Sequence, residues 1–237
     1  MNLLTHNIDN LTRLWQAYGY YSKGGLQVNT NWPRKIWLVD PTSDFTTTDL
    51  KSISKHDASY KVALWPHTNN RKLKSYLSLE TGSQLHFMSL MMTEYSPRNP
   101  SSADLVLQKL PVVNRQYIDT FVDVCSNGFG YDISPEVMYS ASTFSEVSLY
   151  LLYQNNSPVA TALTYVENGV CGIYQVSVPN LYRGKGYAKS MMIMLLNEIK
   201  KSDLETATLQ ASMMGLPLYA NLGFQENGQL RFYALRH

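Results

Sequence analysis

The stretch Leu181-Tyr182-Arg183-Gly184-Lys185-Gly186-Tyr187-Ala188-Lys189 decides the fold, because a strand leads into it and a helix leads out of it. The residues from Val170 to Val178 are mostly β-branched or apolar, and they predict a strand that ends before Pro179. Beyond the stretch, apolar residues recur at helical spacing at Ala188, Met191, Met192, Leu195, Leu196 and Ile199. The two glycines therefore lie in a turn at a helix N-terminus.

This turn has the properties of a phosphate-binding loop. About four backbone amides at a helix N-terminus lack intrahelical partners, and the helix dipole is positive there. Arg183, Lys185 and Lys189 add positive charge, so the turn predicts a phosphate or diphosphate cradle. The alternative is a solvated basic loop, which is commoner for a Gly-x-Gly turn. The P-loop spacing is absent, and Lys189 takes the third glycine's place in the dinucleotide pattern.

Two motifs together resemble the GCN5-related N-acetyltransferase (GNAT) family. Arg183-Gly184-Lys185-Gly186-Tyr187-Ala188 is similar to the family's acyl-CoA loop, Gln/Arg-x-x-Gly-x-Gly/Ala. Some thirty residues later, Leu218-Tyr219-Ala220-Asn221-Leu222-Gly223-Phe224 is similar to its Leu-Tyr-x-x-Leu-Gly-Phe segment. The resemblance covers roughly residues 105–237. It implies an α/β (α+β) fold, with a mixed and mostly antiparallel sheet flanked by helices.

Composition excludes several classes of protein. The 237 residues are 44% hydrophobic and 16% charged, which favours a folded chain with a real core. A net charge of +2 with scattered lysines gives no sign of a nucleic-acid partner. No apolar run approaches the ~20 residues of a membrane span, and the N-terminus has no signal-peptide layout. Neither the histidines nor Cys125 and Cys171 show metal-ligand spacing, so we expect no metal, no disulfide framework and a cytoplasmic protein.

The clearest linker is Ser96-Pro97-Arg98-Asn99-Pro100-Ser101-Ser102. It predicts a smaller N-terminal α/β domain at residues 1–95, a linker at 96–104 and the GNAT domain at 105–237. In the first domain we expect a helix capped by Asn7 that ends near Gly19. Strands are expected at 35–39, 61–65 and 84–95, and helices at 47–54 and 71–79. We hypothesise an incomplete GNAT-like repeat without the acyl-CoA loop; the alternative is an unrelated α/β domain.

Local signals are clearer in the second part. After a strand at 105–112, Asn114 predicts a helix cap, Gly128-Phe129-Gly130 a helix end, and Ser134-Pro135-Glu136 a second helix start. Strands are expected at 147–153, 159–166 and 170–178, with Asn168-Gly169 as a hairpin turn. Then follow a strand at 206–211, a helix at 216–222, and two terminal strands separated by a turn at 226–228. This is the element order of the family.

The resemblance implies acetyl-CoA as co-substrate, with its pantetheine arm between the parted strands 170–178 and 206–211. Main-chain groups of Val176, Ser177 and Val178 would pair with the pantetheine amides. The diphosphate would take the amides from Gly184 to Lys189, namely those of Gly184, Lys185, Gly186, Tyr187, Ala188 and Lys189. Arg183 and Lys189 could neutralise the diphosphate or meet the 3′-phosphate. Ser212 could replace the asparagine expected near pantetheine, where Met213 stands.

Tyr219 is the candidate general acid, because the resemblance places its phenol near the departing thiolate. The alternative is a packing tyrosine, the usual role among the 17 tyrosines. Thr208 stands where some members carry a glutamate base. Candidate relay acids are Glu167, Glu146, Glu136 and Asp132, each of which is more commonly a solvated carboxylate.

These features predict an acetyl-CoA-dependent N-acetyltransferase in which a primary amine attacks the thioester directly. A small amine, an amino acid or an amine antibiotic is favoured over a protein as acceptor. One alternative is a non-catalytic acyl-CoA-binding sensor or interaction module, which Thr208 and Met213 favour. Another is an enzyme that uses the basic loop for a nucleotide phosphate.

Overall fold

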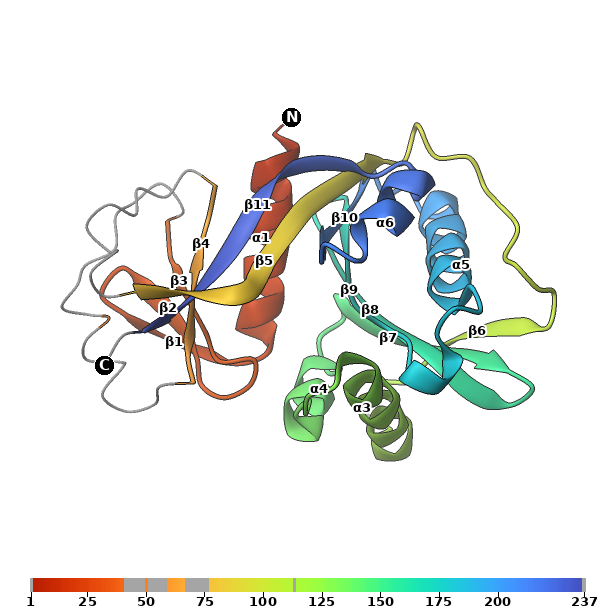
Figure 1. Ribbon diagram of the computed structural model, residues 1–237, viewed down its shortest axis with the longest axis horizontal. Helices are drawn as coiled ribbons and strands as arrows, with labels where there is room; N and C mark the ends of the chain where they lie inside the picture. Colours follow the sequence, from red (N-terminus) through yellow and green to blue (C-terminus); the bar gives the residue numbers. More distant parts are fainter. Residues whose placement is uncertain (1, 41–49, 51–58, 67–76, 113, 236–237) are drawn as a thin grey trace.

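The computed structural model describes residues 2–40, 50, 59–66, 77–112 and 114–235. The strands of this described part form one 11-stranded sheet in the order β1-β2-β3-β4-β11-β5-β10-β9-β8-β7-β6 (Figure 1). Their bounds are β1 Tyr20–Lys23, β2 Leu26–Asn29, β3 Lys35–Leu38, β4 Lys61–Leu64, β5 Leu77–Met91, β6 Leu105–Lys109, β7 Val147–Gln154, β8 Ser157–Glu167, β9 Val170–Ser177, β10 Thr206–Ala211 and β11 Gln225–Leu235. The sheet is mixed and mostly antiparallel, as predicted.

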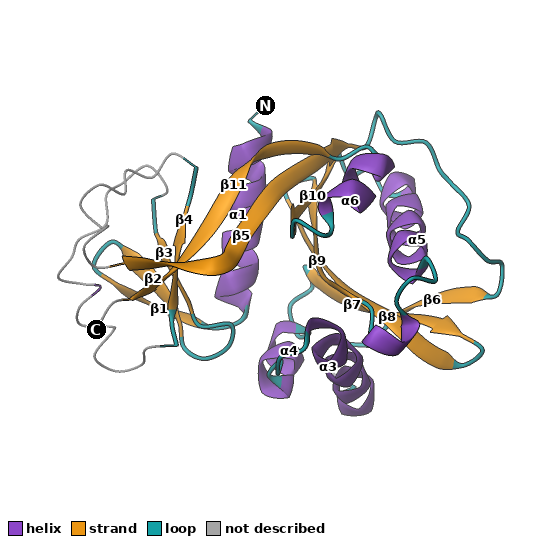
Figure 2. Cartoon of the chain, in the orientation of Figure 1, coloured by secondary structure: helices purple, strands orange, loops and turns teal. Residues whose placement is uncertain are grey.

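Helices cover both faces of this sheet (Figure 2). On one face, α1 (Leu3–Ala17), α3 (Arg115–Phe129) and α4 (Pro135–Ala141) share one buried apolar cluster. On the other face, α5 (Tyr187–Lys201) and α6 (Leu216–Leu222) share a second cluster. Each long helix is amphipathic, so burial of its apolar face against the sheet is the main source of its stability.

The same strand arrangement occurs twice along the sheet. In the first half, β1, β2 and β3 are antiparallel neighbours, β4 lies parallel to β3, and β11 pairs antiparallel with β4. In the second half, β7, β8 and β9 are antiparallel neighbours, β10 lies parallel to β9, and β5 pairs antiparallel with β10. This correspondence supports the hypothesis that the first part is an incomplete repeat of the second.

Each half borrows its last strand from the other. β5 comes from the first part of the chain, but its final residues His86–Met91 pair with β10. β11 comes from the second part, but Arg231–Ala234 pair with β4. The two long strands also pair with each other, from Gln225 opposite Ser89 to Leu235 opposite Leu77. The division at residues 96–104 stays a prediction, and strands from both sides of it alternate in one sheet.

The predicted linker is held against α5. Ser101 Oγ lies 2.7 Å from Ser190 Oγ, and the Asn197 side chain donates to Arg98 O at 2.9 Å. In Figure 1 this segment runs past α5 on its way from β5 to β6. The segment therefore packs along α5 and crosses the apolar cluster of α5 and α6 between β5 and β6.

Most local signals in the second part are confirmed. The Asn114 side chain accepts from the Tyr117 N–H at 3.4 Å, and α3 ends at Gly130 with φ of 77°. Ser134 caps α4 ahead of Pro135. Asn168 and Gly169 both have positive φ between β8 and β9, as a type I′ turn requires. These signals succeed because each acts through neighbouring residues alone.

Three predictions were wrong. Asn2, and not Asn7, caps the first helix. The expected terminal hairpin at 226–228 is a bulge within the single strand β11, which keeps its pairing with β5 on both sides. β5 already begins at Leu77, where a helix was expected to continue to residue 79. The rest of that expected helix, at 71–76, and the helix expected at 47–54, apart from Leu50, lie outside the described residues.

Asn7 instead ties α1 to the sheet. It is fully buried, and its Nδ2 donates to Met88 O at 2.9 Å and to Leu209 O at 3.2 Å. Its Oδ1 accepts from the Gln210 side chain at 2.6 Å. A buried amide is favourable only when its hydrogen bonds are made, and Asn7 makes them with β5 and β10.

We expect Asn7→Ala to lower the free energy of unfolding by about 2 kcal/mol, because two buried carbonyls lose a donor. The matched control is Asn127→Ala. That exposed α3 side chain donates to Asp123 O one turn back in the same helix, so the change should stay within about 0.5 kcal/mol. Urea titration at constant m measures both values. An equal effect of the two substitutions would contradict this role for Asn7.

Candidate functional site

The parallel strands β9 and β10 part at their C-terminal ends. They pair only at Val170–Thr206, Cys171–Ala207 and Gly172–Thr208, although β9 continues to Ser177 and β10 to Ala211. The register of β8 and β9 shifts just where Gln175 has φ of 51°. This bulge bends β9 away from β10. The result is a gap in the hydrogen-bonded ladder, with unpaired main-chain groups on both strands.

The glycine turn lies directly beyond β9. After the 3₁₀ turn Asn180–Tyr182, Gly184 and Gly186 adopt φ of 77° and 81°, values that a side chain would strain. Gly186 is the N-cap of α5, and the first amide to bond back to it belongs to Ser190, at 3.0 Å. The amides of residues 187–189 therefore lack intrahelical acceptors. Such a helix start fits a diphosphate.

Two side chains of the predicted loop make hydrogen bonds to other parts of the protein, and the Lys185 ammonium lies 5.7 Å from the centre of the Tyr182 ring. The Tyr187 phenol is buried and donates to Gln154 Oε1. The Arg183 guanidinium donates to Val178 O at 3.2 Å and to Gly128 O at 2.6 Å, which ties the loop to β9 and α3. Lys185 and Lys189 are exposed. The loop's amides and these two ammonium groups thus remain as its groups for binding an anion.

The end of β9 offers its main chain and not its polar side chain. Ser177 Oγ donates to Cys125 O at 3.1 Å on the α3 face. A Cβ on Gly128 would lie 1.9 Å from Ser177 Oγ, so α3 packs closely on this strand. Val176 and Val178 are half-buried beside the α5 cluster. The predicted pantetheine contacts of residues 176–178 stay a prediction.

Tyr219 lies on α6, on the same face of the sheet as α5. It is half-buried, with its ring 6.1 Å from the Phe224 ring in an edge-to-face arrangement. Burial raises the pKa of Tyr219 to about 12, because the phenolate would lose hydration. Ser212, at the end of β10, accepts from the Gly215 N–H at 3.2 Å and so shapes the turn before α6. The catalytic role of Tyr219 and the cofactor contact of Ser212 stay predictions.

Three of the four candidate relay acids lie away from the parted strand ends. Glu167 pairs with Arg13 at 3.8 Å. Glu167 and Glu146 both lie near Tyr165, beside the start of β9. The eight residues of β9 separate that end from the parted end by about 23 Å. Glu136 pairs with Arg115 at the start of α3, about 20 Å from the helix end beside Val178.

Two further residues from the sequence analysis, Asp132 and Thr208, lie outside these ion pairs. Asp132 is exposed on the turn between α3 and α4. Thr208 is fully buried, and its hydroxyl has no hydrogen-bond partner among the described residues.

Sequence reasoning missed a histidine–carboxylate pair beside the end of β10. His86 on β5 is opposite Ala211, and its Nδ1 lies 2.8 Å from Glu226 Oε1 on β11. The two residues are 140 positions apart. Only the pairing of β5 with both β10 and β11 brings them together, and no local signal marks that pairing.

The cysteines serve as core residues. Cys125 and Cys171 are buried, and burial raises the pKa of each thiol to about 12. Neither would supply a thiolate near neutral pH. Within the described ranges, no group of three or more potential ligands could hold a metal ion. No helix in that same part of the chain has the length and apolarity to span a membrane.

Comparison with known proteins assigns the family. The family model for the acetyltransferase (GNAT) domain matches residues 110–234. The chain belongs to the GNAT acetyltransferase family. A curated Bacillus subtilis relative, the SPbeta prophage-derived uncharacterized N-acetyltransferase YokL, is 36% identical over 69 residues. That match covers 27% of this GNAT chain and 38% of the relative.

Solved structures share the fold over nearly the whole chain. A GCN5-related N-acetyltransferase from Kribbella flavida has a TM-score of 0.71 at 12% identity, covering 99% of this chain and 95% of that one. A putative GNAT acetyltransferase from Novosphingobium aromaticivorans has a TM-score of 0.63 at 14% identity, covering 98% and 97%. A tandem GNAT protein from the clavulanic acid biosynthesis pathway has 0.62 at 11% identity, covering 89% and 78%.

We expect the Tyr219 phenol to stay protonated through pH 10, because its buried environment disfavours the phenolate. The measurement is a pH titration of ¹³Cζ-tyrosine resonances, with the Tyr219 signal assigned by its loss in Tyr219→Phe. A signal that moves to the phenolate position around pH 10 would contradict the burial argument.

Proposed function

We propose that this GNAT protein transfers the acetyl group of acetyl-CoA to a primary amine. The observation that carries the proposal is the parting of β9 and β10 beside a glycine turn at the start of α5. The parted strands leave main-chain donors and acceptors for the pantetheine amides. The turn leaves amides and two ammonium groups for the diphosphate. Both features lie at one end of the sheet, where a single acetyl-CoA molecule would use them together.

The acetyl-CoA site uses the main chain more than side chains. Val176, Ser177 and Val178 would pair with pantetheine through their peptide groups, and the amides from Gly184 to Lys189 would hold the diphosphate. Lys185 and Lys189 would neutralise its charge. Arg183 acts indirectly, since its guanidinium fixes the loop to Val178 and Gly128. Ser212 would act through the turn that it caps.

The chemistry is direct transfer without an acyl-enzyme. The neutral amine attacks the thioester carbonyl, a C–N bond forms, and the C–S bond breaks. Tyr219 donates its proton to the departing thiolate. Burial raises the pKa of Tyr219 to about 12, so the phenol carries this proton near neutral pH. Buried Cys125 and Cys171 take no part, and their reduced state suits a cytoplasmic location, which we infer.

The acceptor is proposed to be a small amine or an amino acid. β5, from the first half of the chain, pairs with β10 and so supplies a wall beside the parted strands. Such a wall favours a small acceptor over a protein surface. The second candidate function is an acyl-CoA sensor, favoured by Thr208 where some members carry a glutamate base, since its buried hydroxyl has no hydrogen-bond partner in the described part of the chain and cannot act as a base near neutral pH.

Calorimetry with CoA tests the binding site. We expect the double variant Lys185→Ala/Lys189→Ala to bind CoA about tenfold more weakly, a loss of about 1.4 kcal/mol, with a reduced salt dependence. The control is Lys201→Ala at the other end of α5, where the ammonium pairs with Glu198. That variant should bind within about twofold of the wild type. Absence of heat from CoA at millimolar concentration would overturn the proposed function.

Thiol release tests the chemistry. The acceptor panel is phenethylamine, glycine, spermidine, kanamycin, a short peptide with an unblocked N-terminus, and hydroxylamine. With the fastest acceptor, Tyr219→Phe should lower kcat about a hundredfold at unchanged affinity for CoA. Binding of CoA without thiol release above buffer would favour the sensor. An unchanged kcat in Tyr219→Phe would remove Tyr219 from the mechanism.

A further inference from the structure

The imidazole of His86 is a buried titratable group that the chemistry above does not use. Its side chain is 6% exposed and lies between the end of β10 and strand β11. Nδ1 is 2.8 Å from Glu226 Oε1, and Nε2 is 3.0 Å from the Met213 sulfur. The two ring nitrogens therefore face different surroundings, a carboxylate on one side and the turn before α6 on the other.

Glu226 determines which nitrogen is basic. A carboxylate can only accept, so in the neutral ring Nδ1 carries the proton and donates it to Glu226. Nε2 then keeps its lone pair. Its neighbours are the Met213 thioether, which has no proton to donate, and the Gln84 amide at a long 3.5 Å. Nε2 therefore lies beside the end of β10 with the Met213 sulfur, an acceptor, on it at 3.0 Å, and it can take a proton from a substrate only once that side chain has rotated away.

His86 and the proposed acid Tyr219 lie on the same face of the sheet. Residues opposite each other on neighbouring strands share a face, and Ala211 opposite His86 belongs to the α5–α6 cluster against which Tyr219 packs. The turn 212–215 connects them. Its Met213 touches Nε2, and a Cβ on its Gly215 would lie 3.0 Å from the Tyr219 ring. An acid and a base therefore flank one turn at the strand ends.

Few charged groups compete around the imidazole. The packed elements contribute Glu226 and Arg231 from β11 and Tyr219 from α6. β10 and the turn 212–215 contain no titratable residue, and the described side chains of β5 add only the polar Gln84 at this position. Arg231 is directed to Gln229 Oε1 at 3.2 Å. Glu226 is the carboxylate in contact with the ring.

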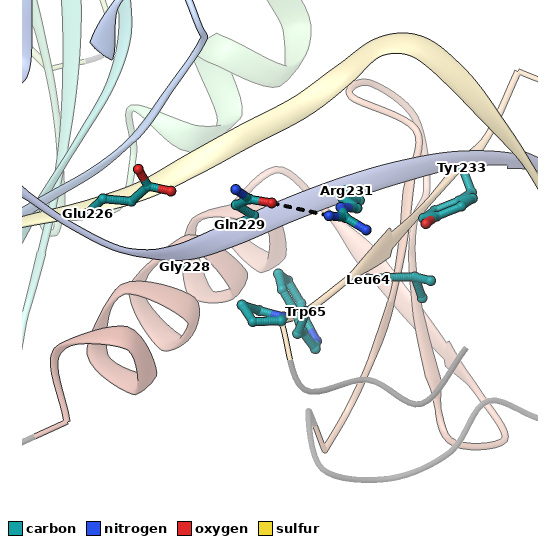
Figure 3. Close-up of a pocket in the computed structure, with 8 residues that line it drawn as sticks. Leu64, Trp65, Glu226, Gly228, Gln229, Arg231 and Tyr233 are labelled. Carbon is teal, nitrogen blue, oxygen red and sulfur yellow. Dashed lines mark hydrogen bonds between the residues drawn. The ribbon is translucent and has the colours of Figure 1, made fainter. Parts of the chain in front are cut away.

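Glu226 also connects this buried ring to solvent. Its side chain is 42% exposed and lines an open cavity of about 330 Å³, together with Gln229, Arg231, Tyr233 and Trp65 (Figure 3). A proton that reaches the imidazole can leave through Glu226 into water in this cavity. A buried base requires such an exit, because otherwise it would keep the proton after each turnover.

We propose that His86 is the general base of acetyl transfer and that Glu226 positions it and releases its proton. The proposal rests on the proposed function. As the amine nitrogen bonds to the acetyl carbon, its proton passes to His86 Nε2, and the electron pair of the C–S bond leaves with sulfur. Tyr219 protonates that thiolate. Afterwards His86 loses its proton through Glu226 to water, and Tyr219 regains one from water.

Met213 is a removable cover in this scheme. Its sulfur rests on Nε2, yet the residue is 66% exposed, so rotation of its unbranched side chain uncovers the nitrogen. Met213→Ala should therefore keep the base and its pH dependence. This substitution separates access to the nitrogen from the basicity of the ring.

The experiment measures kcat/KM for thiol release from about pH 6 to about pH 9, with the fastest acceptor of the panel and with hydroxylamine. We expect His86→Gln to lower kcat/KM at least a hundredfold. Its profile should also lack the fall in kcat/KM toward low pH (the acid limb) that the wild-type protein shows. The loss should be smaller with hydroxylamine, which is already neutral at the assay pH. Glu226→Gln should lose nearly as much, because an amide can donate to Nδ1 and leave the proton on Nε2. Glu226→Asp should restore part of the activity.

Three controls separate the outcomes. His6→Gln removes a histidine on α1 and should leave the profile unchanged, and CoA calorimetry on every variant reports folding and cofactor binding. Wild type that fails to bind CoA would overturn the proposed function itself. If the wild-type protein releases thiol and His86→Gln still shows the fall in kcat/KM toward low pH, His86 is not the base. The same conclusion follows if Asp132→Asn, and not His86→Gln, loses that fall. Binding of CoA without turnover of any acceptor would also count against the base.

Discussion

The antiparallel pairing of β5 with β11 is the constraint on which the rest of the structure depends. Each strand comes from one part of the chain and extends the half of the sheet that the other part forms. β5, from the first part, is the neighbour of β10, and β11, from the second part, is the neighbour of β4. Removing either part would expose a long unpaired strand edge. The exchange therefore makes the two halves one folding unit. It also explains why a family model that matches residues 110–234 describes only part of the molecule.

The exchange also determines what the first half contributes to the site. Its parallel pair β3–β4 matches β9–β10, and registered pairing there is limited to Lys35–Lys61 and Ile36–Val62. However, Trp37 follows on β3, fully buried, with its ring 5.3 Å from that of Trp15 on α1. The crossover sequence from Val39 to Tyr60 contains no glycine that could form a diphosphate loop. The first half thus repeats the strand arrangement of the second but lacks a diphosphate loop. Its contribution to the site is strand β5, which pairs with β10.

The sequence predicts those features that depend on near neighbours. The caps at Asn114 and Ser134, the turn at Asn168-Gly169 and the helix after Gly186 follow from local hydrogen bonding and backbone preference. The failures all involve distant partners. Asn7 is a residue type that often caps helices, but its side chain instead makes buried hydrogen bonds to β5 and β10. Residues 226–228 have the composition of a turn, but pairing with β5 on both sides holds them in one strand as a bulge.

The same distinction applies to the site. The loop and the Tyr219 segment are continuous in sequence, so the sequence predicts both, whereas His86 and Glu226 meet only because two exchanged strands lie side by side. A missing acid at Thr208 therefore does not imply a missing base. A sheet that takes a strand from another part of the chain can take its proton acceptor from there too. In this protein the strand that closes the GNAT half also carries the one described histidine beside the end of β10.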